Sequence, residues 1–181
     1  IQLLDEPFAD PSLLPTYFLS KFTRQFVKVS LSGDGSDEIY GGYPTYLARK
    51  IGDNIPPFLF YILNPISNLI PVSMENISLD FKIKKFINGL KYNNKDIRHQ
   101  IWLGSFDFLQ KSKLFSKSIK EYLGKQINDL EILSNYMLNC DTENNWERSL
   151  WIDMRFYLQD NMLVKIDRAS MMNSLEVRVP Y

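Results

Sequence analysis

The sequence predicts an α/β domain whose visible part is mostly helical, with one short parallel-type strand. Residues 27–31 alternate and are rich in β-branched side chains, and they end at a glycine-rich turn. From Pro56 onward, apolar residues recur at helical spacing. Because a single strand cannot form a stable sheet, we expect its parallel neighbours to lie outside the chain.

The helical segments follow from apolar periodicity. A polar loop leads into a helix over residues 12–26, with Pro15 near its start, where proline is tolerated. After the turn, apolar spacing predicts a second helix that begins near Asp37 and continues to Leu47. Gly89 and the following asparagines are expected to close the helix over 79–90. The other expected helices cover residues 58–70, 96–103, 116–126, 129–138, 145–164 and 167–175.

Composition narrows the functional classes. Lysine plus arginine and aspartate plus glutamate both number 21, so there is no basic surplus to favour nucleic acid as a partner. The longest apolar stretch, 56–71, is interrupted by polar residues and prolines, which argues against a membrane span. Cys140 and His99 are each the only residue of their type and are interpreted as structural. A lone cysteine fits the reducing cytoplasm.

The turn at residues 32–38, SGDGSDE, is the segment most suggestive of chemistry. Ligands of open α/β sheets bind beyond the carboxyl ends of the strands. Gly33 and Gly35 allow a close approach of the backbone to a ligand, and amides at a following helix start suit phosphate oxygens. Asp34 and Asp37 add carboxylates, which beside phosphates usually indicate Mg²⁺.

Several common motifs do not fit this turn. There is no Gly-Lys-Ser/Thr for a Walker A loop. A dinucleotide fingerprint would need glycine in place of Glu38, and an EF-hand loop would need it in place of Ile39. A tight strand-to-helix turn with acidic N-capping and no ligand remains an alternative.

Three blocks of the sequence, in this order, resemble segments of one known protein family. The first is DEPFADPS at 5–12 with PTY at 15–17, and the second is LSGDGSDE at 31–38 followed by GGY at 41–43. The third is LVKIDRASM at 163–171 followed by SLEVRVPY at 174–181. Together these blocks resemble the C-terminal synthetase domain of the asparagine synthetase family, and the resemblance covers the whole chain.

The resemblance implies a nucleotide alpha-hydrolase-like (PP-loop ATP pyrophosphatase) fold and ATP-dependent amide formation. Family enzymes adenylate the side-chain carboxylate of aspartate, release pyrophosphate and let ammonia attack, giving asparagine and AMP. A glutaminase domain, normally on the same chain, supplies ammonia from glutamine, and a homodimer is compatible. By position, Ser32 and Gly33 would contact ATP, and Asp37 would bind Mg²⁺ on the pyrophosphate. Asp34 would act as the catalytic acceptor for the amine or intermediate.

The resemblance also implies that parts of the site lie beyond this sequence. The chain starts at Ile1, and no Ser-Gly-Gly-x-Asp-Ser phosphate loop occurs between residues 1 and 181. The N-terminal glutaminase cysteine and a lysine that follows the Arg-Val-Pro segment are missing as well. We therefore expect an internal fragment that is inactive alone. Two alternatives stay open: a same-fold synthetase acting on another carboxylate, and a non-catalytic helical interaction module.

Other polar and aromatic residues have structural as well as functional interpretations. Glu176 and Arg178 are expected to form an ion pair that holds the last segment against the site, with substrate contact as the alternative. Lys165, Asp167 and Arg168 belong to a helix near the site in the family pattern. The lysine-rich stretch 82–91 is expected to be a solvated face. Three aromatic residues are expected in the core: Trp102, Phe106 and Phe108.

Overall fold

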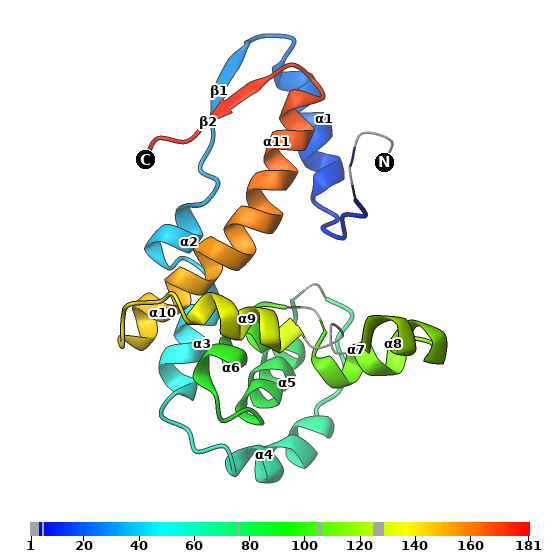
Figure 1. Cartoon of the computed structure of the whole chain (residues 1–181), viewed down its shortest axis with the longest axis vertical. Helices are drawn as coiled ribbons and strands as arrows, with labels where there is room; N and C mark the ends of the chain where they lie inside the picture. Colours follow the sequence, from blue (N-terminus) through cyan, green and yellow to red (C-terminus); the bar gives the residue numbers. More distant parts are fainter. Residues whose placement is uncertain (1–3, 5, 76, 105, 125–128) are drawn as a thin grey trace. The chain divides into compact units, whose positions relative to one another are not determined.

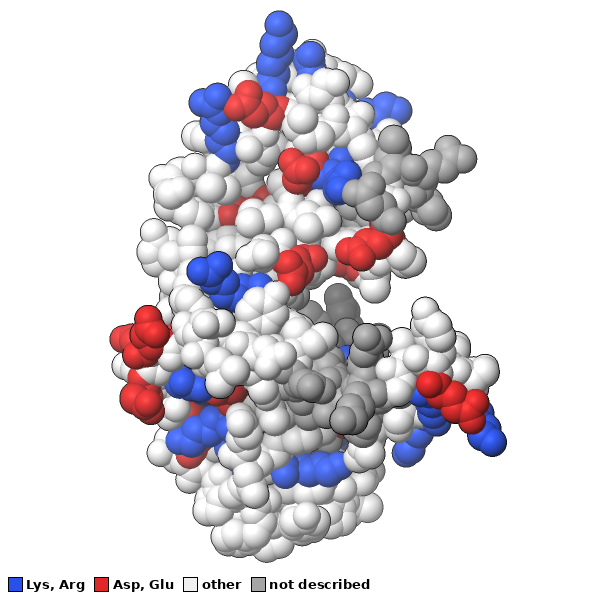
Figure 2. Space-filling model, in the orientation of Figure 1, with Lys and Arg blue, Asp and Glu red and all other residues white. Residues whose placement is uncertain are grey.

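The chain forms two compact units (Figure 1). The computed structural model describes all residues except 1–3, 5, 76, 105 and 125–128. Unit 1 consists of Ile1–Gly42 and Asp153–Tyr181, and unit 2 of Tyr43–Ile152. Acidic and basic side chains are interspersed over the face drawn in Figure 2. Within the described ranges, every helix is too short or too polar to serve as a membrane span.

Unit 1 contains a two-stranded parallel sheet beside two packed helices. Strand β1 (Val29–Leu31) pairs with β2 (Glu176–Arg178) in the register Val29↔Glu176 to Leu31↔Arg178. Helix α1 (Leu13–Thr23) packs on α11 (Val164–Met171). The expectation that all neighbours of β1 lie outside the chain is therefore wrong. Three residues are too few to show the alternation by which a strand is recognised in sequence.

The helix expected from Asp37 to Leu47 is two helices. Helix α2 (Ser36–Tyr40) ends at Gly41, whose φ is 73°, and α3 (Pro44–Gly52) begins with a proline. A left-handed glycine and an N-terminal proline are ordinary stop and start signals. The aromatic spacing, which continues across this break, obscured them. Helix α2 has only five residues, and the expected binding of phosphate by the amides at its start stays a prediction.

The helix expected over 145–164 is also divided. Helix α10 (Asn145–Ile152) lies in unit 2, whereas the π-helix η2 (Asp153–Leu163) lies in unit 1. Such a long π-helix is rare. It continues directly into α11, so the expected break after Val164 is absent. Helix α11 stops before Leu175 because Ser174 adopts a φ of 55° and the Leu175 amide donates to the Ser170 carbonyl.

Unit 2 is helical in its described part. Helix α5 (Leu79–Leu90) has the predicted bounds, and α7 (Phe108–Leu114) was not predicted as a separate helix. A capping box of Asp107 and Gln110 starts α7, and this pattern is readable in the sequence. The other helices are α4 (Leu59–Asn68), α6 (Lys95–Leu103), α8 (Lys117–Leu123) and α9 (Asp129–Met137). Residues 125–126 of the expected 116–126 helix lie outside the described residues.

Trp102 is central to the core of unit 2, as predicted. Its ring stacks on Phe86 with centroids 5.4 Å apart, and its Nε1 donates to the Phe86 carbonyl over 3.0 Å. Gly89 lies inside α5 rather than closing it, and a Cβ there would lie 2.0 Å from the Trp102 Nε1. Phe106, expected in the core, is 54% exposed. The side chain of Phe108 lies outside the described residues.

The lysine-rich stretch is only partly a solvated face. Lys84 is half-buried and donates to the Ile70 carbonyl over 3.0 Å. Burial lowers the pKa of Lys85, whose ammonium lies 5.4 Å from the centre of the Phe81 ring. The structure thus corrects the expectation for two of these lysines, because their long alkyl stems pack on apolar surface.

Candidate functional site

The glycine turn follows directly from the sheet of unit 1. The Ser32 amide donates to the Arg178 carbonyl over 2.8 Å, which extends the pairing of β1 and β2 to the start of the turn. Gly35 has a φ of 90°, a conformation that favours glycine. A Cβ on Gly35 would lie 3.1 Å from the Tyr181 hydroxyl and 3.3 Å from Leu158. The turn is therefore fixed by strand pairing on one side and by side-chain packing on the other.

Ser32, Gly33 and Asp34 lie together in this turn, as the sequence predicted. The Ser32 hydroxyl donates to Asp34 Oδ2, and the Asp34 amide donates to Ser32 Oγ over 3.2 Å. Helix α2 has Gly35 at its N-cap position and no side-chain cap, so Asp34 does not cap it. A Cβ built on Gly33 would meet no atom within 4 Å, which leaves its main chain approachable by a ligand.

Asp37 presents an exposed carboxylate beside a glycine. A Cβ on Gly42 would lie 2.0 Å from Asp37 Oδ1, so a side chain at this position would displace the Asp37 carboxylate. The Asp37 backbone carbonyl accepts from the amides of Gly41 and Gly42, which fixes the residue at the end of the turn. In the described part of the chain, the Asp37 carboxylate forms no ion pair and accepts no hydrogen bond.

The acidic residues of the turn fit a metal site only if a bound ligand supplies further coordinating oxygens. Across the described residues, no group of three or more His, Cys, Asp or Glu side chains could hold a metal ion. Mg²⁺ is usually bound through one or two carboxylates together with substrate phosphates and water. Asp37 alone thus suits an ion whose other ligands are phosphate oxygens, and it does not suit a metal held by protein alone.

Tyr181 covers the turn, a role that sequence reasoning missed. Its hydroxyl donates to the carbonyl of Gly33 over 3.3 Å and also to that of Asp34. Its ring meets Tyr40 edge-on, with centroids 6.2 Å apart. Desolvation and the nearby charges of Asp34 and Glu38 raise the pKa of Tyr181, so the hydroxyl remains a donor at neutral pH. This contact depends on the pairing of β2, which the sequence did not predict.

The first and third sequence blocks meet at a buried lysine. Lys165 Nζ lies 3.1 Å from Asp10 Oδ2 and 2.9 Å from Ser12 Oγ. Burial alone would raise the pKa of Asp10, but hydrogen bonds from Ser12 and Lys165 and the lysine charge outweigh it and lower that pKa. Of the two roles weighed for Lys165, the geometry supports packing, because it fixes the loop before α1 against α11.

Tyr157 of η2 is half-buried near the charges of the loop and of the glycine turn. Its pKa is raised first by burial and then by the charges of Asp10 and Glu38. Glu38 is itself fully buried in α2. Tyr157 had no sequence signal, because its position depends on the π-helical geometry of η2. Apart from Tyr43, the residues of all three resembling blocks belong to unit 1.

The ion pair expected between Glu176 and Arg178 is present, with Arg178 Nε 2.6 Å from Glu176 Oε1. Both side chains are exposed, and exposed pairs stabilise proteins little. The backbone pairing of β1 and β2, rather than this ion pair, holds the last segment beside the turn. Asp167 is exposed on α11, and Arg168 is half-buried.

This arrangement, with a strand, a glycine turn and an acidic short helix joined to a C-terminal helical segment, contains the segments in which the sequence resembles a synthetase domain. The chain belongs to the asparagine synthase family, whose sequence profile matches residues 1–181. The predicted resemblance is therefore confirmed. The nucleotide alpha-hydrolase fold is consistent with the parallel strand pair but is not established by it.

Curated relatives carry the same family name. The chain is 28% identical to "Asparagine synthetase [glutamine-hydrolyzing] 1" of Bacillus subtilis, over 98% of this chain and 26% of that protein. It is 30% identical to a putative asparagine synthetase of Mycobacterium tuberculosis, over 98% of this chain and 26% of that protein. It is 33% identical to a putative asparagine synthetase of Methanocaldococcus jannaschii, over 99% of this chain and 32% of that protein. The chain thus spans about a quarter to a third of these relatives. No solved structure matches it significantly.

Proposed function

We propose that this chain contributes to the synthetase site of an enzyme that forms asparagine from aspartate, ATP and ammonia in the cytoplasm. The observation that carries the proposal is the glycine turn after β1. There, an approachable Gly33 main chain and the Asp37 carboxylate flank the same loop in a member of the asparagine synthase family. Ammonia would come from glutamine, through a glutaminase domain such as the names of the relatives suggest.

Ser32 and Gly33 would contact the nucleotide in this proposal. Ser32 is fixed by its backbone bond to Arg178 and by its contact with Asp34, so its position costs little further ordering on binding. Tyr181 donates to the carbonyls of Gly33 and Asp34 and so holds the loop from the opposite side. These contacts would hold the turn in place before the nucleotide binds.

The two aspartates would have different roles. Asp37 would hold Mg²⁺ through its exposed carboxylate, and bound Mg²⁺ would neutralise charge on the pyrophosphate oxygens. Asp34 Oδ2 accepts from Ser32, whereas its Oδ1 has no hydrogen bond within the described residues. Asp34 Oδ1 would therefore be available to accept a proton from the incoming amine.

An assay of pyrophosphate release tests this proposal. The protein expressed from its complete reading frame is supplied with ATP, Mg²⁺ and ammonia, and aspartate is compared with other carboxylic acids. We expect release that depends on aspartate and is matched by asparagine and AMP. Release with a different acid and none with aspartate would instead indicate a same-fold synthetase. No release with any acid would indicate the non-catalytic interaction module.

A further inference from the structure

A hollow lies in unit 2, whereas the glycine turn belongs to unit 1. It encloses about 540 Å³ between α3, the start of α6 and the start of α10. Its lining includes the cations Arg49, Lys50 and Lys95, together with Trp146. Its lining also includes the carboxylate of Asp53, so the cations outnumber the anions among the described residues of its wall, whereas the chain as a whole has no net charge.

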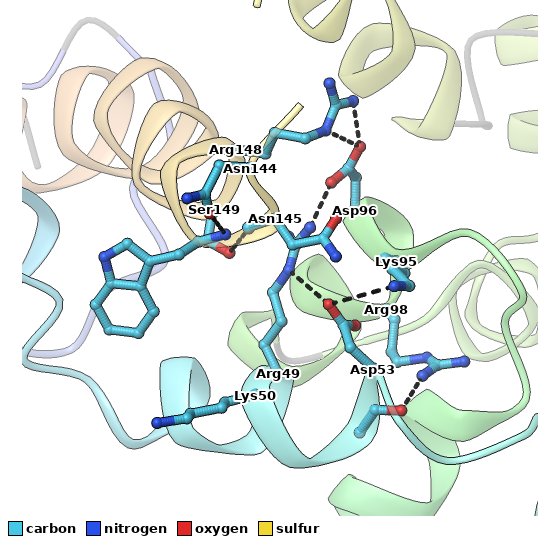
Figure 3. Close-up of polar contacts among 12 residues, drawn as sticks. Arg49, Lys50, Asp53, Lys95, Asp96, Arg98, Asn144, Asn145, Arg148 and Ser149 are labelled. Atoms are coloured by element: carbon cyan, nitrogen blue, oxygen red, sulfur yellow. Dashed lines mark hydrogen bonds and ion pairs between the residues drawn. The ribbon is translucent and has the colours of Figure 1, made fainter. Parts of the chain in front are cut away.

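An ion-pair network forms one side of this hollow (Figure 3). Asp96 Oδ1 lies 2.8 Å from Arg49 Nη2, and Asp96 Oδ2 lies 2.7 Å from Arg148 Nη2. Asp53 lies 3.6 Å from Arg49 Nε and 3.9 Å from Lys95 Nζ. The two carboxylates of Asp53 and Asp96 therefore form ion pairs with three cations, Arg49, Lys95 and Arg148.

Arg49 retains hydrogen-bonding capacity that this network does not use. The residue is only 3% exposed, and its Nη1 is buried without a hydrogen-bond partner among the described residues. An unsatisfied buried donor costs roughly 1–3 kcal/mol, and more when it is charged. Asp53 Oδ1, in the same network, is also buried without a hydrogen-bond partner in the described part of the chain, so the network leaves both a donor and an acceptor unused.

The remaining charges indicate which sign of charge a ligand in the hollow would carry. Lys50 lines the same hollow, makes no ion pair within the described ranges, and extends along α3 away from Asp53. Lys50 thus adds a fourth cation to the two carboxylates. A phosphate group carries up to two negative charges and several acceptor oxygens, and so can accept hydrogen bonds from the exposed ammonium of Lys50 and balance the excess of positive charge.

We infer that the hollow between α3, α6 and α10 binds the phosphate group of a small molecule, through Arg49, Lys50 and Lys95. The lining carries these three cations beside the carboxylate of Asp53, whose Oδ2 pairs with Arg49 and Lys95, so the hollow keeps an excess of positive charge. Trp146, 42% exposed in the lining, provides a ring on which an aromatic part of the ligand can stack. The inference does not rest on the proposed function, since none of these residues belongs to the glycine turn.

Calorimetric titration of the full 181-residue chain with inorganic phosphate tests the inference. We expect saturable binding that weakens about tenfold in Lys50→Gln and in Lys95→Gln. Lys120→Gln, an exposed lysine of α8 outside the hollow, is the matched control and should bind as the unchanged protein does. Absence of saturable phosphate binding would overturn the inference. An equal loss of affinity in Lys120→Gln would also overturn it, and so would unchanged affinity in both Lys50→Gln and Lys95→Gln.

A second titration with phenyl phosphate separates the two sources of such a group. If phenyl phosphate binds at least about tenfold more tightly than inorganic phosphate and loses this gain in Trp146→Leu, the ligand carries a ring. If inorganic phosphate and phenyl phosphate bind with equal affinity, and Lys50→Gln abolishes the binding of both, the ligand is free phosphate. Phenyl phosphate binding that survives both lysine substitutions would contradict the site.

Discussion

Asp34 is the residue for which a structural and a chemical role are most easily separated. Since Gly35 occupies the N-cap position of α2, Asp34→Asn removes no helix cap. We expect a stability change below about 0.5 kcal/mol, as is usual for surface substitutions. Loss of a general base should slow asparagine formation about a hundredfold. Thermal melting measured beside the rate checks both expectations, and a lower melting temperature with an unchanged rate would restore the capping interpretation.

At the scale of single residues, the sequence could predict part of the candidate site. Ser32, Gly33, Asp34 and Asp37 are neighbours in sequence, so their proximity needed only a turn. Their proposed functions remain predictions. Tyr181 and Tyr157 could not be predicted, because each reaches the site through a non-local element, strand β2 or the π-helix η2.

Gly89 within α5 gives a test at the scale of elements. Alanine normally favours a helix over glycine by roughly 1 kcal/mol. Here the added Cβ would lie 2.0 Å from the hydrogen-bonded Nε1 of Trp102. We expect the steric overlap with Trp102 to destabilise the helix more than the better helix propensity of alanine stabilises it. Gly89→Ala should therefore lower the free energy of unfolding of unit 2 by about 1–3 kcal/mol.

Urea unfolding followed by tryptophan fluorescence measures this change, because Trp102, Trp146 and Trp151 all lie in unit 2. Gly33→Ala is the matched control, since its Cβ would enter open space. An unchanged or higher urea midpoint for Gly89→Ala would contradict the packing described here.

Elements were predictable in proportion to their length and periodicity. Helix α5 has enough turns for its apolar stripe to define both ends. Strand β2 has three residues, and its identity comes from pairing with β1 rather than from its own pattern. The break between α2 and α3 had local signals in Gly41 and Pro44, but the tyrosine spacing across it mimicked one continuous helix.

At the scale of the whole molecule, acid sensitivity should come partly from Asp96. Burial alone would raise the pKa of Asp96, but hydrogen bonds from Arg148 and Arg49, reinforced by their charges, lower it below 3.8. The carboxylate therefore stabilises the folded state fully above pH 3.8, and this contribution is lost as pH falls through the lowered pKa.

Asp96→Asn should lower the free energy of unfolding of unit 2 at pH 7 by about 3–5 kcal/mol, because it leaves two arginines without their shared partner. The urea midpoint of the variant should also fall less than that of the unchanged protein between pH 5 and pH 3. Equal acid losses in the two proteins would show that Asp96 is not the group responsible.

The most direct test of the proposed site is the rate of aspartate-dependent pyrophosphate formation in Asp37→Asn, measured in the protein expressed from its complete reading frame. The substitution keeps size and shape but removes the charge that would hold a divalent cation. With Asp160→Asn as an exposed control on η2, we expect Asp37→Asn to lower the rate about a hundredfold, or roughly 3 kcal/mol of transition-state stabilisation. Hydrolysis of glutamine and the melting temperature should remain unchanged. A near-normal rate at saturating Mg²⁺, accompanied by earlier melting, would mean that the turn is structural and that the site assignment is wrong.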